Sequence, residues 1–396
     1  MIYRRFGRTN LQMPVFSCGG MRYQFKWQDM PLSEIPAESQ QNLEATIRRA
    51  VEVGINHIET ARGYGCSERQ LGQILPKLPR QSLIVQTKIG PNDNPDQFTR
   101  EFEESLERLQ LQYVDLLAIH GANDAQTMDQ AIRPNGCLAA ARKIQQRGLA
   151  RHIGFSTHAP LREILRGITT ERDGGFDYVN IHWYYIFQRN WPAIEEAARR
   201  DMGVFIISPS DKGGMLYDPP AKLVELCKPL HPIVFNDLFC LSRPQPPLIH
   251  TLSIGAARPG DFDLHLKALD HLADTENVLP PILKRLEAAY GGAVDPSLRD
   301  PYALPEWEQI PGQVNVPVIL WLRNLVAAYD MNKYAKMRYG MLGNGGHWFP
   351  GKNAGALDEP ALRQTLGSAG DRIVPLLKNM HEAFGGESIK RLSQGG

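Results

Sequence analysis

Short apolar runs alternate with longer stretches of helical periodicity along the first two thirds of the chain. The runs have the length of buried strands and lie at 15–17, 55–59, 83–88, 114–120, 152–156, 178–182, 204–208 and 252–254. Between them, apolar residues recur at three- and four-residue intervals, which predicts helices over 39–53, 67–75, 97–109, 136–146, 160–166, 191–199 and 262–272. Before the first run, the sequence predicts a short hairpin with Gly7 and Asn10 at its turn.

Strict alternation of strand and helix predicts a parallel sheet, and eight repeats close a (β/α)8 TIM barrel. An open, doubly wound sheet shares the alternation and is the structural alternative. It is disfavoured because no G-x-G-x-x-G motif follows the first strand. The chemically useful side chains also follow several strands rather than one crevice.

The pattern changes after residue 275. The remainder has helical stretches, among them 317–329 and parts of 359–384, separated by a proline-rich irregular segment, and no strand alternation. We therefore expect two domains, a barrel over 1–275 and an additional, mainly helical C-terminal domain over 276–396.

Single polar residues close several of the apolar runs. Glu59 ends INHIE, Lys88 ends SLIVQTK and His120 ends VDLLAIH, while Tyr64 follows Glu59 within ETARGYG. These runs recur about every 30 residues, the length of one strand–helix unit. Catalytic residues of such barrels sit at the carboxyl ends of different strands. We therefore expect an acid, a phenol, an ammonium and an imidazole to meet at one rim and form an acid–base site.

Composition and charge mainly exclude other classes of protein. A hydrophobic fraction of 42% and a charged fraction of 22% are ordinary for a soluble globular chain, and a net charge of +1 gives no electrostatic reason to expect nucleic acid or membrane as partner. Five widely spaced cysteines without CxxC pairs indicate reduced thiols and no structural metal. With no apolar leader in MIYRRFGRTN and no bilayer-length apolar run, we expect a cytoplasmic protein. No feature of the sequence predicts an oligomeric state.

Four motifs, ETARGYG, IVQTK, DLLAIH and IGFSTH, follow one another in the order and spacing typical of the aldo-keto reductases. The chain resembles this family, whose motifs run roughly D-T-A-x-x-Y-G, T-K, a strand ending in His, and G-x-S-[N/T]. The resemblance covers the N-terminal two thirds of the chain and implies a (β/α)8 fold and NADPH-dependent reduction of a small carbonyl substrate. It also implies that Tyr64 is the proton donor, that Lys88 and the carboxylate at 59 tune it, and that His120 positions the substrate oxygen. The family has an aspartate where this chain has Glu59, so the charge is kept and the reach grows by one methylene.

The chemistry of these side chains supports the same roles. Hydride addition to a carbonyl leaves an alkoxide, so a proton must arrive as charge develops. A free tyrosine has a pKa of about 10, and a nearby ammonium lowers it toward a working value. Glu59 can supply the counter-charge for the lysine, and His120 can polarise the carbonyl oxygen. His57, His152 and His182 are interpreted as structural, with His182 the strongest candidate for a role in the site.

The resemblance also implies a nicotinamide site. Ser156 and Thr157 in GFSTH match the pair beside the carboxamide, and Asn180 falls where the family usually has a glutamine. The loops CGGM and SPSDKGG resemble the first loop and the loop over the pyrophosphate. The cofactor-binding candidates are Gly20, Met21, Ser156, Thr157, Asn180, Ser208, Ser210, Lys212, Gly255 and Arg258.

Three positions bear on the choice of cofactor. In IGAARPGDF the family's phosphate-reading Lys and Arg positions are Gly255 and Asp261. Asp261 would repel a 2′-phosphate, whereas Arg258 can replace the missing charge. Ile207 replaces the aromatic residue that commonly stacks on the nicotinamide. On balance, NADP(H) is favoured over NAD(H).

The C-terminal third narrows the resemblance. IPGQVNVPVILWLRNLVAAYDMNKYAKMRYGML and HWFPG are similar to a subgroup of these reductases that carries a ferredoxin-type C-terminal domain with a CxxCxxCxxxCP run. In this chain the corresponding positions are Asp300, Ala303, Glu306 and Ile310. Because thiolates hold such clusters and no cysteine follows Cys240, we expect no iron–sulfur cluster and no metal. Apolar packing of the 317–329 helix should hold the domain together, with Trp307 and Trp348 as docking side chains.

The sequence thus predicts an NAD(P)H-dependent oxidoreductase that reduces an aldehyde or ketone to an alcohol, with Tyr64 as proton donor. The alternative is a catalytically weak, reductase-like protein that binds the nicotinamide cofactor and a protein partner, as a sensor or scaffold. Glu59, Ile207 and Asp261 favour the alternative, whereas the intact tyrosine, lysine and histidine favour the enzyme. The cysteine count excludes an iron–sulfur electron carrier.

Overall fold

The computed structural model describes residues 1–211, 214–243, 247–343 and 350–386. This part of the chain forms two compact units. The first comprises Met1–Gly214 and Asn236–Thr275, and the second comprises Met215–Phe235 and the described chain from Glu276 onward. Residues 215–235, which the sequence analysis assigned to the barrel domain, therefore belong to the second unit.

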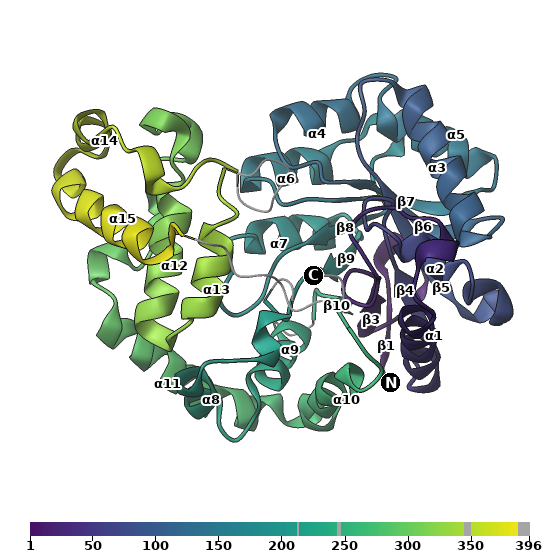
Figure 1. Cartoon of the computed structure of the whole chain (residues 1–396), viewed down its shortest axis with the longest axis horizontal. Helices are drawn as coiled ribbons and strands as arrows, with labels where there is room; N and C mark the ends of the chain where they lie inside the picture. The colour runs from purple at the N-terminus through teal and green to yellow at the C-terminus, as the bar shows by residue number, and fades with distance from the viewer. Residues whose placement is uncertain (212–213, 244–246, 344–349, 387–396) are drawn as a thin grey trace. The chain divides into compact units, whose positions relative to one another are not determined.

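Eight parallel strands close a barrel in the first unit, which confirms the predicted (β/α)8 fold and excludes the open sheet (Figure 1). Each strand pairs with the next along the chain, and the last strand pairs with the first. The strands are β3 (Phe16–Gly19), β4 (His57–Glu59), β5 (Ile84–Ile89), β6 (Val114–His120), β7 (Ala150–Ser156), β8 (Tyr178–Ile181), β9 (Gly203–Ile206) and β10 (Thr251–Ile254).

Helices cover the outside of this barrel (Figure 1). They are α1 (Ala37–Glu52), α2 (Ser67–Leu71), α3 (Pro95–Leu109), α4 (Ala125–Ile132), α5 (Cys137–Gln146), α6 (Leu161–Thr169), α7 (Trp191–Arg199) and α10 (Asp261–Leu266). Helix α9 (Pro232–Ser242) begins in the second unit and ends in the first.

Two of the predicted helices were too long. The helix predicted over 67–75 ends at Leu71, and Pro76, which has no N–H to donate to the Gly72 carbonyl, prevents it from continuing. The helix predicted over 262–272 is α-helical only to Leu266 and continues as a 3-10 helix over Lys267–Asp274. Helix α4 was missed, although Asp124 caps it by accepting from the Thr127 backbone N–H at 2.8 Å.

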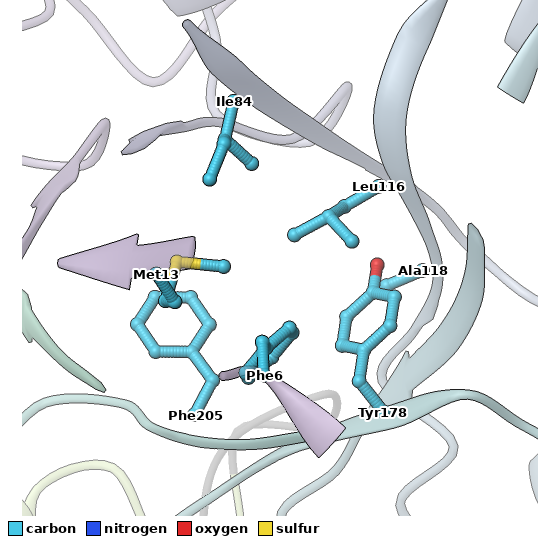
Figure 2. Packing of buried hydrophobic residues seen from close by; sticks show 7 residues of the cluster. All are labelled: Phe6, Met13, Ile84, Leu116, Ala118, Tyr178 and Phe205. Atoms are coloured by element: carbon cyan, nitrogen blue, oxygen red, sulfur yellow. The ribbon is translucent and has the colours of Figure 1, made fainter. Parts of the chain in front are cut away.

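The predicted hairpin closes the amino end of the barrel. β1 (Tyr3–Arg5) pairs antiparallel with β2 (Gln12–Pro14), and the turn between them contains Gly7–Thr9 and Asn10. Figure 2 shows how the hairpin side chains meet barrel side chains in one apolar cluster, which consists of Phe6, Met13, Ile84, Leu116, Ala118, Tyr178 and Phe205. A Cβ on Gly203 would lie 2.6 Å from the Phe6 ring, so a glycine is required where that ring enters.

The pleat of the strands fixes what lies above this apolar floor. Successive side chains point to opposite faces, so residues two apart share a face. Ile84 of β5 lies in the floor, which puts Lys88 on the interior face. Leu116 and Ala118 of β6 likewise lie in the floor, which puts His120 inside. The interior is therefore apolar at its amino end and polar at its carboxyl end.

The second unit is helical. Its helices are α8 (Ala221–Cys227), most of α11 (Thr275–Ala293), α12 (Val316–Tyr329), α13 (Asn332–Tyr339), α14 (Glu359–Leu366) and α15 (Gly370–Phe384). Helix α12 is buried along most of its length, including Ile319, Leu322 and Leu325, as the sequence predicted for 317–329. Trp307 is half-buried, and Trp348 lies outside the described residues.

None of the helices in the described ranges is long and apolar enough to cross a membrane.

Candidate active site

A cavity opens at the carboxyl ends of the barrel strands. It encloses about 670 Å³ of space between atoms, part of which is open solvent. It is lined by Gly19, Met21, Arg22, Glu59, Tyr64, Lys88, His120, Ser156, His158, Ile207, Ser208, Ser210, Gly214, Ser253 and Gly255.

The strands deliver the four predicted catalytic side chains to this cavity. Glu59 and His120 are the last residues of β4 and β6, and Lys88 is next to last in β5. Tyr64 lies in the turn after β4, where its backbone N–H donates to the Ala61 carbonyl at 3.0 Å. All four line the cavity, so the structure brings together what the sequence places in three separate βα units.

The Lys88 ammonium lies at the centre of this group. Its Nζ forms an ion pair with Glu59, donates to the Thr60 carbonyl at 2.8 Å and donates to the Tyr64 hydroxyl at 3.3 Å. Lys88 is 1% exposed and Glu59 3%. The longer glutamate therefore reaches the lysine from the position where the family has an aspartate.

Burial and pairing act on the pKa of Lys88 in opposite directions. Burial lowers it well below the usual value for a lysine, because a charged ammonium is poorly solvated there. The Glu59 carboxylate in contact with it favours the charged form. The ammonium thus depends on one carboxylate for its charge.

Two rings enclose the Tyr64 phenol. His120 and Trp27 each meet it edge to face, with ring centroids at 5.5 and 6.0 Å. The loop carrying Trp27 is fastened beside it, since the Cys66 backbone N–H donates to the Lys26 carbonyl at 3.1 Å. Gly65 has a φ of 52° and packs against this loop so closely that no Cβ fits. These contacts hold the Tyr64 ring between Trp27 and His120.

The predicted cofactor residues fall into two groups. Met21, Ser156, Ser208, Ser210 and Gly255 line the cavity. Gly20, Thr157, Asn180 and Arg258 are not among its lining residues. Lys212 lies outside the described residues.

The structure also shows the surroundings of predicted cofactor residues that do not line the cavity. A Cβ on Gly20 would lie 2.5 Å from the Glu59 carbonyl, so a glycine lets the first loop cross β4. The Thr157 hydroxyl is buried and donates to the Ala122 carbonyl at 2.6 Å. Arg258 is largely exposed.

Among the buried polar side chains that lack a hydrogen-bond partner within the described residues, two belong to the predicted cofactor set. They are Asn180, with both its amide oxygen and its amide nitrogen, and Ser210, with its hydroxyl. Asn180 lies in β8 in register with Ser156 of β7, which lines the cavity. A buried polar group without a partner is costly, so these atoms fit a site that a polar ligand completes.

Arg22 follows the CGGM loop and was missed by sequence reasoning. It lines the cavity, donates to the Gly255 carbonyl and lies 3.4 Å from the Asp261 carboxylate. Asp261 also accepts from the Ala257 backbone N–H at 2.8 Å and from Arg258 at 3.2 Å. Asp261 is therefore held between two guanidinium groups, and the three side chains together carry one net positive charge.

His158 is a second lining residue that the sequence analysis did not single out, although it ends the quoted motif IGFSTH. Its Nδ1 lies 2.6 Å from Nε2 of His182, the histidine that the sequence favoured among three for a role in the site. Another of those three, His57, lies inside the barrel with its Nδ1 2.6 Å from the Ser17 hydroxyl. His152 is half-buried near the start of β7, away from the carboxyl end.

Within the described ranges, no three His, Cys, Asp or Glu side chains gather in a way that could hold a metal ion.

The chain was compared with known families and proteins. The model of the aldo/keto reductase family matches residues 17–215. Similar curated proteins include an L-galactose dehydrogenase from Arabidopsis thaliana, 39% identical over 121 residues that make up 28% of this chain and 37% of that protein. An L-glyceraldehyde 3-phosphate reductase from Escherichia coli K12 is 28% identical over 178 residues, 41% of this chain and 47% of that protein. The chain thus spans less than half the length of these curated relatives.

Solved structures share the fold. An aldo-keto reductase, AKR11C1 from Bacillus halodurans, matches with a TM-score of 0.59 and 19% identity over 72% of this chain and 96% of its own. An aldose reductase from Schistosoma japonicum matches with a TM-score of 0.53 and 18% identity over 72% of this chain and 91% of its own.

Proposed function

The chain belongs to the aldo/keto reductase family, and on this basis we propose that it reduces the carbonyl group of a small aldehyde or ketone to an alcohol with a reduced nicotinamide cofactor. One observation carries the proposal. The buried ammonium of Lys88 contacts both the Glu59 carboxylate and the Tyr64 hydroxyl, and all three side chains line the cavity.

This contact suits Tyr64 to donate a proton. Lys88 donates to the phenol oxygen, so the hydroxyl keeps its own proton for a ligand in the cavity. The ammonium stabilises the phenolate that remains after transfer and so favours release of the proton. The Glu59 carboxylate keeps the buried lysine charged while this happens. His120, whose ring meets Tyr64, donates a hydrogen bond to the carbonyl oxygen and polarises it.

We infer that a nicotinamide cofactor binds in the same cavity. When bound, it supplies the hydride that the carbonyl carbon accepts. The unpartnered amide of Asn180 and the unpartnered hydroxyl of Ser210 provide a donor and acceptors for its polar groups. Ser156 would contact the carboxamide, while Met21, Ser208 and Gly255 would contact the remainder.

We propose a preference for NADPH over NADH. The sequence alone suggested that Asp261 repels a 2′-phosphate, but this carboxylate is paired with both Arg22 and Arg258. The net positive charge of the three side chains favours an added phosphate, and a guanidinium binds phosphate in a bidentate manner. Arg22, which lines the cavity, joins Arg258 as a candidate for that contact.

We also propose that the C-terminal unit derives from a ferredoxin-type domain that has lost its cluster. The resemblance assigns the cluster cysteines to four positions, which lie in or beside successive 3-10 turns: Asp300, Ala303, Glu306 and Ile310. Asp300 accepts from the Tyr302 backbone N–H at 3.2 Å, and Ile310 is buried. Asn324 of α12 donates to the Leu298 carbonyl at 2.7 Å and ties this segment to the helix. On this proposal, capping and packing take the place of the bonds that a cluster would make.

The proposal is tested on the purified full chain. NADPH and NADH are titrated while tryptophan fluorescence is followed, and oxidation of the cofactor is then measured with a series of aldehydes and ketones. We expect saturable binding, tighter for NADPH, and turnover of at least one carbonyl compound. Tight binding without turnover of any compound would favour the alternative of a sensor or scaffold.

A further inference from the structure

A pair of histidines lies beside the proposed reduction site and has no part in the chemistry above. Nδ1 of His158 and Nε2 of His182 are 2.6 Å apart, and the two rings lie 4.7 Å apart with an interplanar angle of 30°. His182 is 1% exposed, and its ring meets Tyr184 and Phe187 edge to face. The other ring of the pair, that of His158, lines the cavity.

Strand register brings the pair to this position. Ser156 of β7 is paired with His120 of β6 on one side and with Asn180 of β8 on the other. The β7–β8 pairing continues past the strand ends, since the Thr157 backbone N–H donates to the Asn180 carbonyl at 3.1 Å. The next step of the same register sets His158 beside His182. His158 therefore lies two residues after Ser156, the residue of β7 that is paired with His120.

The local backbone holds the pair in place. The His158 N–H donates to the Asn123 side chain at 2.8 Å, and the Asn190 side chain donates to the His182 carbonyl at 3.0 Å. Helix α6 begins at Leu161, so the positive end of its dipole lies three residues beyond His158.

The charge of the cavity lining favours an anion. Among the described lining residues, Glu59 is the single carboxylate, and it is engaged by Lys88. Arg22 and the imidazoles of His120 and His158 add donors without a further acid. In a pair of imidazoles joined by one hydrogen bond, each ring has a second nitrogen beyond that bond, and a proton added to the pair makes it positively charged and able to donate through those nitrogens.

We propose that the His158–His182 pair binds an anionic group, a carboxylate or a phosphate, on the carbonyl substrate, so that the enzyme selects charged aldehydes or keto acids. The inference rests on the proposed reductase function and specifies its substrate class. His158 contacts the oxyanion, and His182 is a positioning residue that supplies the shared hydrogen bond and spreads the charge.

The test compares matched substrates. The ratio kcat/KM is measured for 4-carboxybenzaldehyde against benzaldehyde and for glyceraldehyde 3-phosphate against glyceraldehyde, which separates a carboxylate from a phosphate. We expect the parent to prefer the charged member of at least one couple by about 10- to 100-fold, as one charge-assisted hydrogen bond allows. The preference should arise mainly in KM, because the bond is present in the ground state and the transition state alike.

Variants assign the preference to the pair. His158→Gln should remove it and leave the reduction of the neutral member within a few-fold of the parent, and His182→Gln should weaken it in part. The matched control is His152→Gln, near the amino end of β7, the strand that ends two residues before His158, and it should keep the preference. Binding of inorganic phosphate and of acetate is measured without turnover from the imidazole NMR signals, of which those of His158 should shift.

These readouts separate the two ideas. Equal kcat/KM for charged and neutral members in the parent, or a preference that survives His158→Gln, would overturn the role of the pair while the reductase function stands. If no carbonyl compound is reduced, the reductase proposal fails. The NMR titration then still decides whether the pair binds anions, and signals that do not move would reject it.

Discussion

The dependence of Lys88 on Glu59 predicts a destabilised and pH-sensitive Glu59→Gln variant. The substitution keeps the size of the side chain and removes the charge that contacts the ammonium. Lys88 then retains the Thr60 carbonyl and the Tyr64 hydroxyl as partners, at 2.8 and 3.3 Å, in a position that is 1% exposed. Both are dipoles, and neither replaces a carboxylate.

The expected size follows from the burial of the pair. Removing one partner of a buried ion pair costs about 3–5 kcal/mol, because the other charge is left unpaired. The loss has a ceiling, since Lys88 can release its proton instead. Each unit by which its pKa falls corresponds to about 1.4 kcal/mol. We expect a loss of about 3 kcal/mol in the free energy of unfolding at pH 6.

Whether the stability of the variant rises or falls with pH depends on whether the folded or the unfolded state binds the Lys88 proton more tightly. Without Glu59, burial acts alone on Lys88 and depresses its pKa in the folded state further below the unfolded value of 10.5. Between these two values the unfolded variant binds the proton and the folded variant does not, so the stability of the variant rises with pH relative to the parent. The deficit should shrink by about 1 kcal/mol or more between pH 6 and pH 9.

Urea denaturation of the parent and the variant at both pH values measures these quantities. The double variant Glu59→Gln/Lys88→Met should recover much of the stability, because it removes the orphaned charge. Asp201→Asn, which breaks the exposed pair with Arg5, is the matched control and should change stability by less than about 1 kcal/mol at either pH. A Glu59→Gln variant as stable as the parent at both pH values would refute the reasoning.

Four further outcomes are expected. Tyr64→Phe should lower kcat by about 100-fold or more and leave the Kd for NADPH within a few-fold, since the phenol acts in the transition state; near-parental turnover would assign the proton to another donor. Glu59→Asp should keep or raise activity because the shorter acid still faces Lys88, and an inactive but folded variant would contradict this. Burial lowers the pKa of His57 to about 3, so below pH 6.5 the unfolded state binds a proton that the folded state excludes, and stability should fall by about 2 kcal/mol between pH 7 and pH 5 on this account. The loss should be smaller in His57→Asn, and an unchanged slope in urea denaturation would reject the assignment. The purified protein should contain no stoichiometric iron or acid-labile sulfide, and a brown protein that loses its colour with chelators would contradict the absence of a cluster.

The barrel could be predicted because each strand is a short apolar run of the kind that a parallel sheet covered by helices buries on both faces, and because such runs recur eight times in alternation with helices. The strand β6 was predicted with the bounds that the structure has, Val114–His120, since its apolar stretch LLAI lies between the polar residues Asp115 and His120. The same regularity placed Glu59, Lys88 and His120 at strand ends. The repeat of strand and helix predicts that these residues lie at one end of the barrel. The structure adds that Lys88 contacts both Glu59 and Tyr64 there.

The loops could not be predicted in the same way, because they follow no period. Asp261 illustrates the consequence. As an isolated acid it suggested repulsion of a phosphate, and its pairing with Arg22 joins residues far apart in the sequence. The pairing of His158 with His182 likewise depends on register beyond the strand ends. The segment 215–235 lies between β9 and β10 in the chain, yet it packs within the second unit, which no local pattern indicates.

The interior of the barrel explains why Glu59 serves one cation. His57 lies two residues before Glu59 on β4 and points to the same side, where its ring lies against Phe205 of the apolar floor, with centroids 5.2 Å apart. Burial, and after it the charge of Lys88, lowers the pKa of His57 to about 3, so this ring is neutral across the working range. A second cation at this level would compete for the carboxylate and weaken its hold on Lys88. The neutral imidazole instead meets the Ser17 hydroxyl at 2.6 Å, and Ser17 lies 2.7 Å from the Thr251 hydroxyl. This uncharged layer leaves the whole charge of Glu59 to the lysine that contacts Tyr64.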